Sequence, residues 1–318
     1  MFQQTRKVKL MLKISGFMVV KDVIKQGYPF VEAIASALPI CDEFLISDGY
    51  STDGTFEMLQ RISSLNRKIK VSRYEWSRRE LTIIADISND LRKKCKSDYL
   101  FYIQAPEIVH EDNVKMLKAL PELFPETDTF CLPFTSVISN LKVQEEFRLR
   151  FCRNLGRINL TGDAWAFSVS KKFIRSEAMS SLKRPKKLLS YVGRGVEWTF
   201  AGSLNNIRSK AIYLPKPIFR YPVLFKDNFI ERCKGHAWHL NLPNFYDLIK
   251  KVEKEEGESF FEKAVQLHRG GLGINYYGEL GGIKMEEHPK IMREFITNRT
   301  TIPRYYVRDS ILDTIASA

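Results

Sequence analysis

Residues 44–55, FLISDGYSTDGT, carry two carboxylates at positions where they could bind a nucleoside. An apolar run ends at Asp48, and the letters GYSTDG after it predict a tight turn. Thr55 is placed to cap a helix that begins directly after this turn. A carboxylate at the end of a buried strand can accept hydrogen bonds from ribose hydroxyls or from a nucleobase N–H. The residues alone leave a second interpretation open, in which Asp48 and Asp53 only stabilise the turn.

The elements that would position this turn alternate between apolar strands and amphipathic helices. Strands are expected at residues 12–20, 43–47, 69–74 and 99–103, and helices at residues 28–38, 55–63 and 81–96. This alternation is typical of a parallel sheet with crossover helices, in which ligands bind beyond the carboxyl ends of the strands. The loops after Val20, Ser47, Tyr74 and Ile103 are therefore predicted to hold the chemistry.

The second half of the chain has shorter strand-like runs, followed by a helical pattern. Strands are expected at residues 130–138, 166–169 and 211–214, and helices at residues 244–255 and 259–268. The predicted fold class is α/β, with a mixed, mainly parallel sheet flanked by helices. We expect one domain over residues 1–225, and a C-terminal helical extension and tail over residues 226–318.

The charge balance favours an anionic partner. The chain has 318 residues, with 50 Lys and Arg against 37 Asp and Glu, and its net charge of +13 would attract nucleoside diphosphates, nucleic acid or acidic lipid. A hydrophobic content of 44% excludes intrinsic disorder. No helix-turn-helix, zinc-finger or RNP pattern is present, so nucleic acid is not expected as a partner. Solubility is the alternative interpretation of the excess charge.

Cysteine usage and hydropathy favour a cytoplasmic protein. The five cysteines lie far apart in apolar or helical stretches and form no CxxC pair, which predicts reduced core residues. They are Cys41, Cys95, Cys131, Cys152 and Cys233. No window approaches 18 uninterrupted apolar residues, so a spanning helix is not expected. The basic run KRPKK at residues 183–187 leaves peripheral membrane contact open, and the oligomeric state is not indicated.

Residues 17–55 resemble the opening of family 2-like glycosyltransferases of the GT-A fold, within the nucleotide-diphospho-sugar transferase superfamily. The matching signature is D-x-x-S-x-D-G-T, met by Asp48, Ser51, Asp53, Gly54 and Thr55. A later helix and strand resemble the family's next motif, and Asn89, Asp98 and Tyr99 occupy its positions. The resemblance covers roughly residues 10–225, and it is most specific in the first hundred.

The resemblance implies an inverting glycosyltransferase that moves a sugar from a UDP- or GDP-linked donor to an acceptor hydroxyl. Asp48 would contact the base or ribose, Val19 and Val20 would form the floor under the nucleoside, and Asp53 would order the loop. Asn89 would join the donor-binding residues. The acceptor, whether a glycan, a lipid-linked molecule or a protein, is not indicated. A nucleotidyltransferase is disfavoured because no glycine-rich phosphate loop with a following lysine lies near the first expected strand.

The sequence departs from the family at the metal motif. The resemblance implies a D-x-D motif that holds Mn²⁺ or Mg²⁺ against the donor diphosphate. This chain reads QAPE there, with Gln104 and Pro106 at the aspartate positions and only Glu107 remaining. Three alternatives stay open. Glu107 could bind the ion, helped by Glu111 or by His236 and His239; basic side chains could replace the metal; or catalysis could be lost, leaving an attenuated relative that binds nucleotide sugar or glycan.

Two further segments would complete the site. Alternation along a strand places Arg148 and Arg150 on one face, where their guanidinium groups could meet phosphate oxygens, although a basic edge strand would look the same. The resemblance places Gly162, Asp163 and Trp165 beside the donor sugar.

The expected catalytic base lies in the segment GRGVEW. Inversion needs a carboxylate that takes the proton from the attacking hydroxyl, and the resemblance assigns this role to Glu197. Asp163 is the alternative base. The remaining interpretation is that Glu197 only caps its helix.

Overall fold

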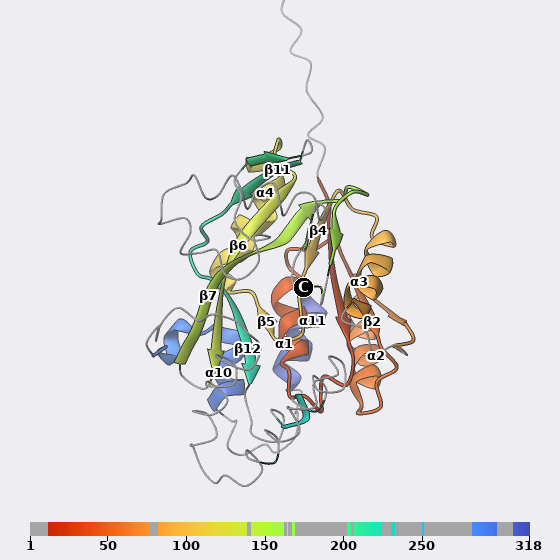
Figure 1. Ribbon diagram of the computed structural model, residues 1–318. Helices are drawn as coiled ribbons and strands as arrows, with labels where there is room; N and C mark the ends of the chain where they lie inside the picture. Colours follow the sequence, from red (N-terminus) through yellow and green to blue (C-terminus); the bar gives the residue numbers. More distant parts are fainter. Residues whose placement is uncertain are drawn as a thin grey trace, which may run out of the picture.

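The computed structural model describes residues 12–76, 82–138, 141–161, 164, 167–168, 202–204, 207–223, 230–232, 234, 250, 282–297 and 308–318. Within these residues the chain forms a large mixed sheet with helices on both faces (Figure 1). The α/β class predicted from the sequence is confirmed. None of the helices in the described ranges is both long and apolar enough to cross a membrane.

Ten strands of the described chain make up the large sheet. They are β1 (Ile14–Val20), β2 (Glu43–Asp48), β3 (Ile69–Arg73), β4 (Tyr99–Tyr102), β5 (Glu107–Ile108), β6 (Thr129–Ile138), β7 (Leu141–Arg153), β10 (Gly202–Leu204), β11 (Ile207–Ala211) and β12 (Ile218–Val223). Their order is β10-β11-β6-β7-β4-β1-β2-β3, with β12 beside β6 and β5 beside β12. Two short strands, β8 (Asn159–Leu160) and β9 (Phe167–Ser168), form a separate pair.

The half of the sheet that contains β3, β2, β1 and β4 is parallel. The strands β1 and β2 are apolar and almost fully buried, as expected for parallel strands covered on both faces. Gly16 in β1 is needed for close packing, because a Cβ there would lie 2.4 Å from a ring carbon of Phe44 in β2. The register pairs Val20 with Asp48, so these strands end side by side.

The other half of the sheet is built around the long strand β7, which runs antiparallel to both β4 and β6. The strand β12 runs parallel to β6 and antiparallel to β5, and it pairs Arg220 with Glu107. Because β7 turns back along β4, side chains near its middle lie beside the carboxyl end of β4. This arrangement brings residues 104–107 close to residues 148–150 despite their separation in sequence.

Helices cover the two faces of the sheet and divide the core. On one face lie α1 (Phe30–Ala37) and α2 (Thr55–Leu65), and on the other lies α3 (Ile83–Lys93), which contacts β1, β2 and β8. A fourth helix, α4 (Val114–Leu123), follows a 3-10 turn, Glu111–Asn113. The larger apolar cluster includes residues of α1, α2 and α4, whereas the smaller one joins α3 to Phe17, Tyr102 and Phe167.

The C-terminal helices pack on the first face rather than extending away from it. The helices α10 (Lys290–Thr297) and α11 (Asp309–Ser317) contact α1, and α11 also contacts α2 (Figure 1). Their side chains Phe295, Ile311 and Ile315 belong to the same apolar cluster as α1 and α2. These helices therefore bury apolar surface of the region predicted as the first domain.

Most expected strands are found within two residues of their predicted bounds, with one exception. The strand expected at residues 211–214 is wrong, because the chain pairs with β6 over Ile207–Ala211 and then leaves the sheet, with Tyr213 74% exposed. The strand β11 has mostly polar side chains, so an apolar pattern in the sequence does not predict it. The helices expected at residues 244–255 and 259–268 lie outside the described residues.

The described cysteines are free and buried, as predicted from their spacing. They are Cys41, Cys95, Cys131 and Cys152. Burial raises the pKa of the Cys95 thiol to about 12, and it raises the pKa of Cys41 and Cys152 as well. These thiols are therefore protonated at neutral pH and act as small apolar core groups. Cys233 lies outside the described residues.

Candidate functional site

The strand order of the parallel half predicts a ligand crevice at one edge of the sheet. The chain moves from β1 to β2 and β3 in one direction, and β4 then lies on the opposite side of β1. The order therefore reverses between β1 and β4, and ligands of open α/β sheets bind outside the carboxyl ends of the strands at such a point. The loops that border this point follow Val20, Asp48 and Tyr102.

Asp48 ends β2 as predicted and is fully buried. Its Oδ2 accepts a hydrogen bond from the backbone N–H of Ser51 at 3.1 Å and another from Arg73 Nε at 3.1 Å. Arg73 ends β3, and the register pairs it with Asp48. The carboxylate is thus held by two donors of its own chain.

Arg73 lies between two aromatic rings. Its guanidinium carbon is 4.2 Å from the ring centre of Tyr50 and 4.1 Å from that of Phe56. Tyr50 is 51% exposed and has a left-handed backbone, with φ of 57°. We call Asp48, Ser51, Arg73, Tyr50 and Phe56 the Asp48 cluster. The sequence analysis missed Arg73 and Tyr50, although a parallel pairing of β2 with β3 would have placed Arg73 beside Asp48.

The loop after β1 is tied to the loop after β2. Lys21 Nζ donates to the carbonyl oxygen of Gly49 at 2.6 Å, and Asp22 N–H donates to Ser51 Oγ at 2.8 Å. Asp53 accepts from the N–H groups of Lys25 at 2.7 Å and Thr55 at 3.0 Å. These bonds hold the two loops together at the edge of the crevice.

The expectation that Thr55 caps α2 is wrong. The residue before the helix is Gly54, which has φ of 93° and makes no side-chain cap. The Thr55 hydroxyl instead accepts a hydrogen bond from Ile24 N–H at 3.3 Å. The Thr55 hydroxyl oxygen therefore binds the loop after β1 and not the first turn of α2.

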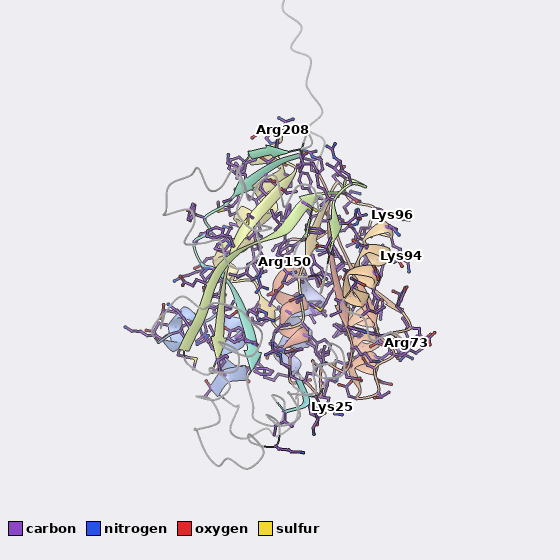
Figure 2. The ribbon with its side chains drawn as sticks, viewed as in Figure 1. Lys25, Arg73, Lys94, Lys96, Arg150 and Arg208 are labelled. Carbon is purple, nitrogen blue, oxygen red and sulfur yellow. The ribbon has the colours of Figure 1, made fainter. Side chains whose placement is uncertain are left out.

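Glu107 lies in a buried group of arginines. Its Oε1 accepts from Arg148 Nη1 at 3.0 Å and from Arg150 Nη2 at 2.6 Å, and all three side chains are fully buried. Its Oε2 accepts from Gln104 N–H at 2.8 Å. Arg148 and Arg150 share one face of β7, as their spacing predicts, because both donate to the same oxygen of Glu107. Figure 2 labels Arg150, which lies near the centre of the view.

Two more arginines adjoin this group. Arg220 pairs with Glu107 across β5 and β12, and it is 6% exposed; Arg232 is 5% exposed and donates to the carbonyl oxygen of Pro222 at 2.9 Å. Burial, together with the charges of Arg148 and Arg232, lowers the pKa of Arg220 to about 10, although the charge of Glu107 opposes this shift. We call Glu107, Arg148, Arg150, Arg220 and Arg232 the Glu107 cluster.

The surroundings of Glu107 do not fit a divalent cation. Both of its oxygens already accept hydrogen bonds, and a cation at Oε1 would lie beside two guanidinium groups. Glu111 lies on the surface, where its Oε2 accepts from Lys290 N–H at 3.2 Å. Across the described parts of the chain, no group of three or more His, Cys, Asp and Glu side chains could hold a metal ion. His236 and His239 lie outside the described residues.

Ala164 links the Glu107 cluster to the next segment of the expected site. Its carbonyl oxygen accepts from Gln104 Nε2 and from Arg150 Nη1, both at 3.4 Å. It is one of the few described non-glycine residues with a left-handed backbone, at φ 58°, and the others are Asp22 and Tyr50 at the same edge. Such strain costs about 1–3 kcal/mol per residue and is concentrated at functional sites.

Asn89 and the β1 valines hold structural positions beside the crevice. The side-chain amide of Asn89 in α3 donates to the carbonyl oxygen of Leu160 at 2.8 Å and accepts from the Leu160 N–H at 2.9 Å. Val20 is buried in the larger apolar cluster, and Val19 is partly buried against the smaller one. The residues Gly162, Asp163, Trp165 and Glu197 lie outside the described residues.

A pocket of about 380 Å³ opens beside the Asp48 cluster, on the side of α3. It is lined by Ser47, Tyr74, Ile87, Asp90, Leu91, Lys93 and Lys94. Ser47 precedes Asp48 in β2, and the N–H of Tyr74 donates to the Asp48 carbonyl oxygen at 2.9 Å. The pocket has the volume of a small-molecule site, and two of its lining residues, Asp90 and Lys93, form an ion pair at 2.8 Å. Figure 2 shows Lys94 on the outer side of α3.

Comparisons with known proteins give only distant likenesses. No family model matches the chain, and no curated protein matches it. The S. aureus TarS 1–349 structure in complex with UDP-GlcNAc is 12% identical at a TM-score of 0.42, and the match covers 96% of this chain and 90% of that one. The mannosyltransferase PcManGT from Pyrobaculum calidifontis in complex with GDP-Man and Mn²⁺ is 10% identical at a TM-score of 0.37, with 97% and 81% covered. The fold therefore stands on the chain's own strand order and register.

Proposed function

We propose that this protein is a family 2-like glycosyltransferase of the GT-A type that moves a sugar from a UDP- or GDP-linked donor to an acceptor hydroxyl, with inversion. The observation that carries the proposal is the reversal of strand order between β1 and β4, the point at which ligands of open α/β sheets bind. The loop after β2 with the D-x-x-S-x-D-G-T signature borders this point, as a nucleotide-sugar site requires.

The nucleoside would lie over the ends of β1 and β2. Val19 and Val20, at the end of β1, would form the floor there, and the exposed ring of Tyr50 offers a face on which a base could stack. Asp48 would contact the base or ribose after exchanging one of its present donors, and Asp53 keeps the loop in place through Lys25 and Thr55. Asn89 would contribute to the donor site indirectly, through its two hydrogen bonds with the backbone of Leu160.

The donor sugar would lie beyond the end of β4. Gln104 and Arg150 both contact the carbonyl oxygen of Ala164. Gly162, Asp163 and Trp165, its neighbours in sequence, would contact the sugar. Glu197 is the proposed base, which takes the proton of the acceptor hydroxyl as that oxygen attacks the anomeric carbon. Asp163 is the alternative base. A glycan, a lipid-linked molecule or a protein would supply the hydroxyl.

The test is a screen of UDP- and GDP-sugars with the full-length protein, with Mn²⁺ present in every reaction. Release of nucleoside diphosphate from one donor is expected, and the anomeric configuration of the product, read by NMR, reports inversion or retention. Glu197→Gln should abolish transfer and leave donor affinity nearly unchanged, because the base acts only in the chemical step.

A second candidate function, a non-catalytic relative that binds nucleotide sugar or glycan, is favoured by the QAPE segment alone. Donor binding without release of nucleoside diphosphate, for every donor tried and with acceptor present, would support that candidate. Absence of binding to all nucleotides would contradict the first proposal, and it would leave only the glycan-binding form of the second.

A further inference from the structure

We infer that the pocket beside α3 binds a monosaccharide that carries one anionic group, as a sugar phosphate does. The pocket has a volume of about 380 Å³, which lies within the range of small-molecule sites. It is separate from the position proposed for the nucleoside. A ligand here therefore goes beyond the proposed function, and the two proposals can fail independently.

The pocket forms at the margin of the sheet. The strand β3 is the last strand on this side, and α3 packs against the two strands inward of it, β2 and β1. The space between α3 and this margin is lined by Ser47 of β2, by Tyr74 directly after β3, and by Ile87 and Leu91 of α3. The pocket therefore has a polar side and an apolar side.

The pocket and the Asp48 carboxylate lie on opposite faces of the sheet. Side chains alternate along β2, so that Leu45 belongs to the smaller apolar cluster, with α3, and Ile46 to the larger one, with α1 and α2. By the same alternation Ser47 faces α3 and Asp48 faces the side of α1 and α2. A ligand in the pocket would thus reach Ser47 without touching the Asp48 carboxylate.

Two hydroxyl groups of the pocket are available to a ligand. Ser47 is 3% exposed, and its hydroxyl makes no hydrogen bond to any part of the chain that the structure describes. The Tyr74 hydroxyl has only a long contact, of 3.5 Å to Asp90 Oδ2. A polar group with little access to water gains free energy when a ligand supplies its partner. A sugar ring offers hydroxyls for these groups and C–H faces for Ile87 and Leu91.

The charged residues of the lining favour an anionic ligand. Lys93 pairs with Asp90 at 2.8 Å, so these two charges offset each other. Lys94 also lines the pocket, is exposed, and has no ion pair with any described residue. The lining therefore carries two lysines against one aspartate, and an anionic group of the ligand would lie beside Lys94.

The experiment measures binding of sugars to the full-length protein by saturation-transfer difference NMR. The probes are glucose 6-phosphate, mannose 6-phosphate and galactose 6-phosphate, each compared with its uncharged sugar. At least one sugar phosphate should bind with a Kd of about 1 mM or lower, and about threefold more tightly than its uncharged form, because the phosphate meets Lys94. Failure of all three to bind at about 10 mM, or equal binding of the charged and uncharged forms, would overturn the inference.

A lysine variant tests whether the phosphate lies in this pocket. Lys94→Gln should remove the preference for the phosphorylated sugar, since the unpaired charge of the lining is lost. Lys96→Gln is the matched control, because Lys96 is exposed close by but does not line the pocket; Figure 2 labels both lysines. The same preference in the two variants would mean that the sugar phosphate binds elsewhere, and the inference would be wrong.

A serine variant tests the hydroxyl of the pocket. Ser47→Ala should weaken binding of the charged and the uncharged sugar about fivefold, as expected for one lost hydrogen bond. The free energy of unfolding, measured by urea denaturation, should not fall, because the hydroxyl has no partner among the described residues. An unchanged affinity, or a loss of stability that reveals a structural partner of the hydroxyl, would contradict the role of Ser47 in binding.

The two proposals fail in different ways. Sugar-phosphate binding that depends on Ser47 and Lys94, in a protein that binds no nucleotide or nucleotide sugar, would contradict the proposed function and support the sugar site. Turnover of a nucleotide sugar, in a protein that binds none of the three sugar phosphates, would support the proposed function and contradict the sugar site.

Discussion

The Asp48 cluster and the Glu107 cluster lie beyond strands on opposite sides of β1, and each contains one fully buried carboxylate. Asp48 accepts from one arginine and from the Ser51 N–H, so one negative charge meets one positive charge. Glu107 accepts from two arginines, and two more adjoin them. The first cluster therefore pairs its carboxylate with one arginine, whereas the second holds four arginines around one carboxylate.

The arginines of the two clusters also differ in how far they are exposed to solvent. The side chain of Arg73 is 31% exposed and stacks between Tyr50 and Phe56, whereas Arg148 and Arg150 are fully buried. A partly exposed guanidinium keeps water as an alternative partner, and a buried one depends on the protein. The two buried carboxylates therefore have different structural roles. Asp48 fixes the loop after β2, and Glu107 fixes the guanidinium groups of Arg148 and Arg150.

The largest expected effect is that of Glu107→Gln on folding. The substitution leaves Arg148 and Arg150 buried without their carboxylate, and breaking a buried pair in this way costs about 3–5 kcal/mol. The free energy of unfolding, measured by urea denaturation, should fall by that amount.

The control for this variant is Glu145→Gln, since Glu145 lies on β7 and is exposed. Its effect should stay within about 0.5 kcal/mol, as for most surface substitutions. A loss below about 1 kcal/mol for Glu107→Gln would mean that the arginines have other counter-ions, and the contrast between the clusters would disappear.

Asp48→Asn should have a smaller effect, of about 1–2 kcal/mol. The amide keeps an oxygen for the Ser51 N–H, and Arg73 can turn to water, because its side chain is partly exposed. The same urea experiment measures the loss, and UDP affinity should fall as well if Asp48 contacts the nucleoside. An effect as large as that of Glu107→Gln would show that the two carboxylates are equally dependent on their partners.

The parallel half of the sheet could be predicted from the sequence because its signals are local. Apolar runs end at Val20, Asp48 and Tyr102, within one residue of the expected positions, and glycine and polar residues follow Asp48 directly. The strand β11 could not be predicted, because its polar residues at the margin of the sheet lack the expected apolar pattern.

The partners of Glu107 could not be predicted from the sequence, because they come from distant strands. Glu107 meets Arg148 and Arg150 only because β7 runs back along β4, and it meets Arg220 through pairing with β12. These contacts span long stretches of sequence that no local motif connects. The sequence therefore indicated Glu107 only as a candidate metal ligand. A motif gives the residue type at a position, but it does not give the side chains that lie around that residue in the fold.

Arg73→Met should cost about 1 kcal/mol, less than either carboxylate change. The variant loses the contact with Asp48 and the stacking on Tyr50 and Phe56, and such cation–π contacts contribute about 0.5–1 kcal/mol at exposed sites. Arg73→Lys, which keeps the charge but not the flat stacking surface, is the matched variant. If both variants lose the same stability, stacking matters more than charge; if the lysine variant matches the wild type, charge alone explains Arg73.

The smallest expected effect is the response of the two clusters to salt. A double-mutant cycle of Asp48→Asn with Arg73→Met should give a coupling of about 0.5–1 kcal/mol that decreases as NaCl is added, since ions reach the partly exposed guanidinium. The cost of Glu107→Gln should change little over the same series, because ions in solution do not reach fully buried groups. A coupling energy between Asp48 and Arg73 that does not change with NaCl would mean that Arg73 is as inaccessible to ions as Arg148. A cost at Glu107 that falls with salt would instead show that anions from solution enter the cluster.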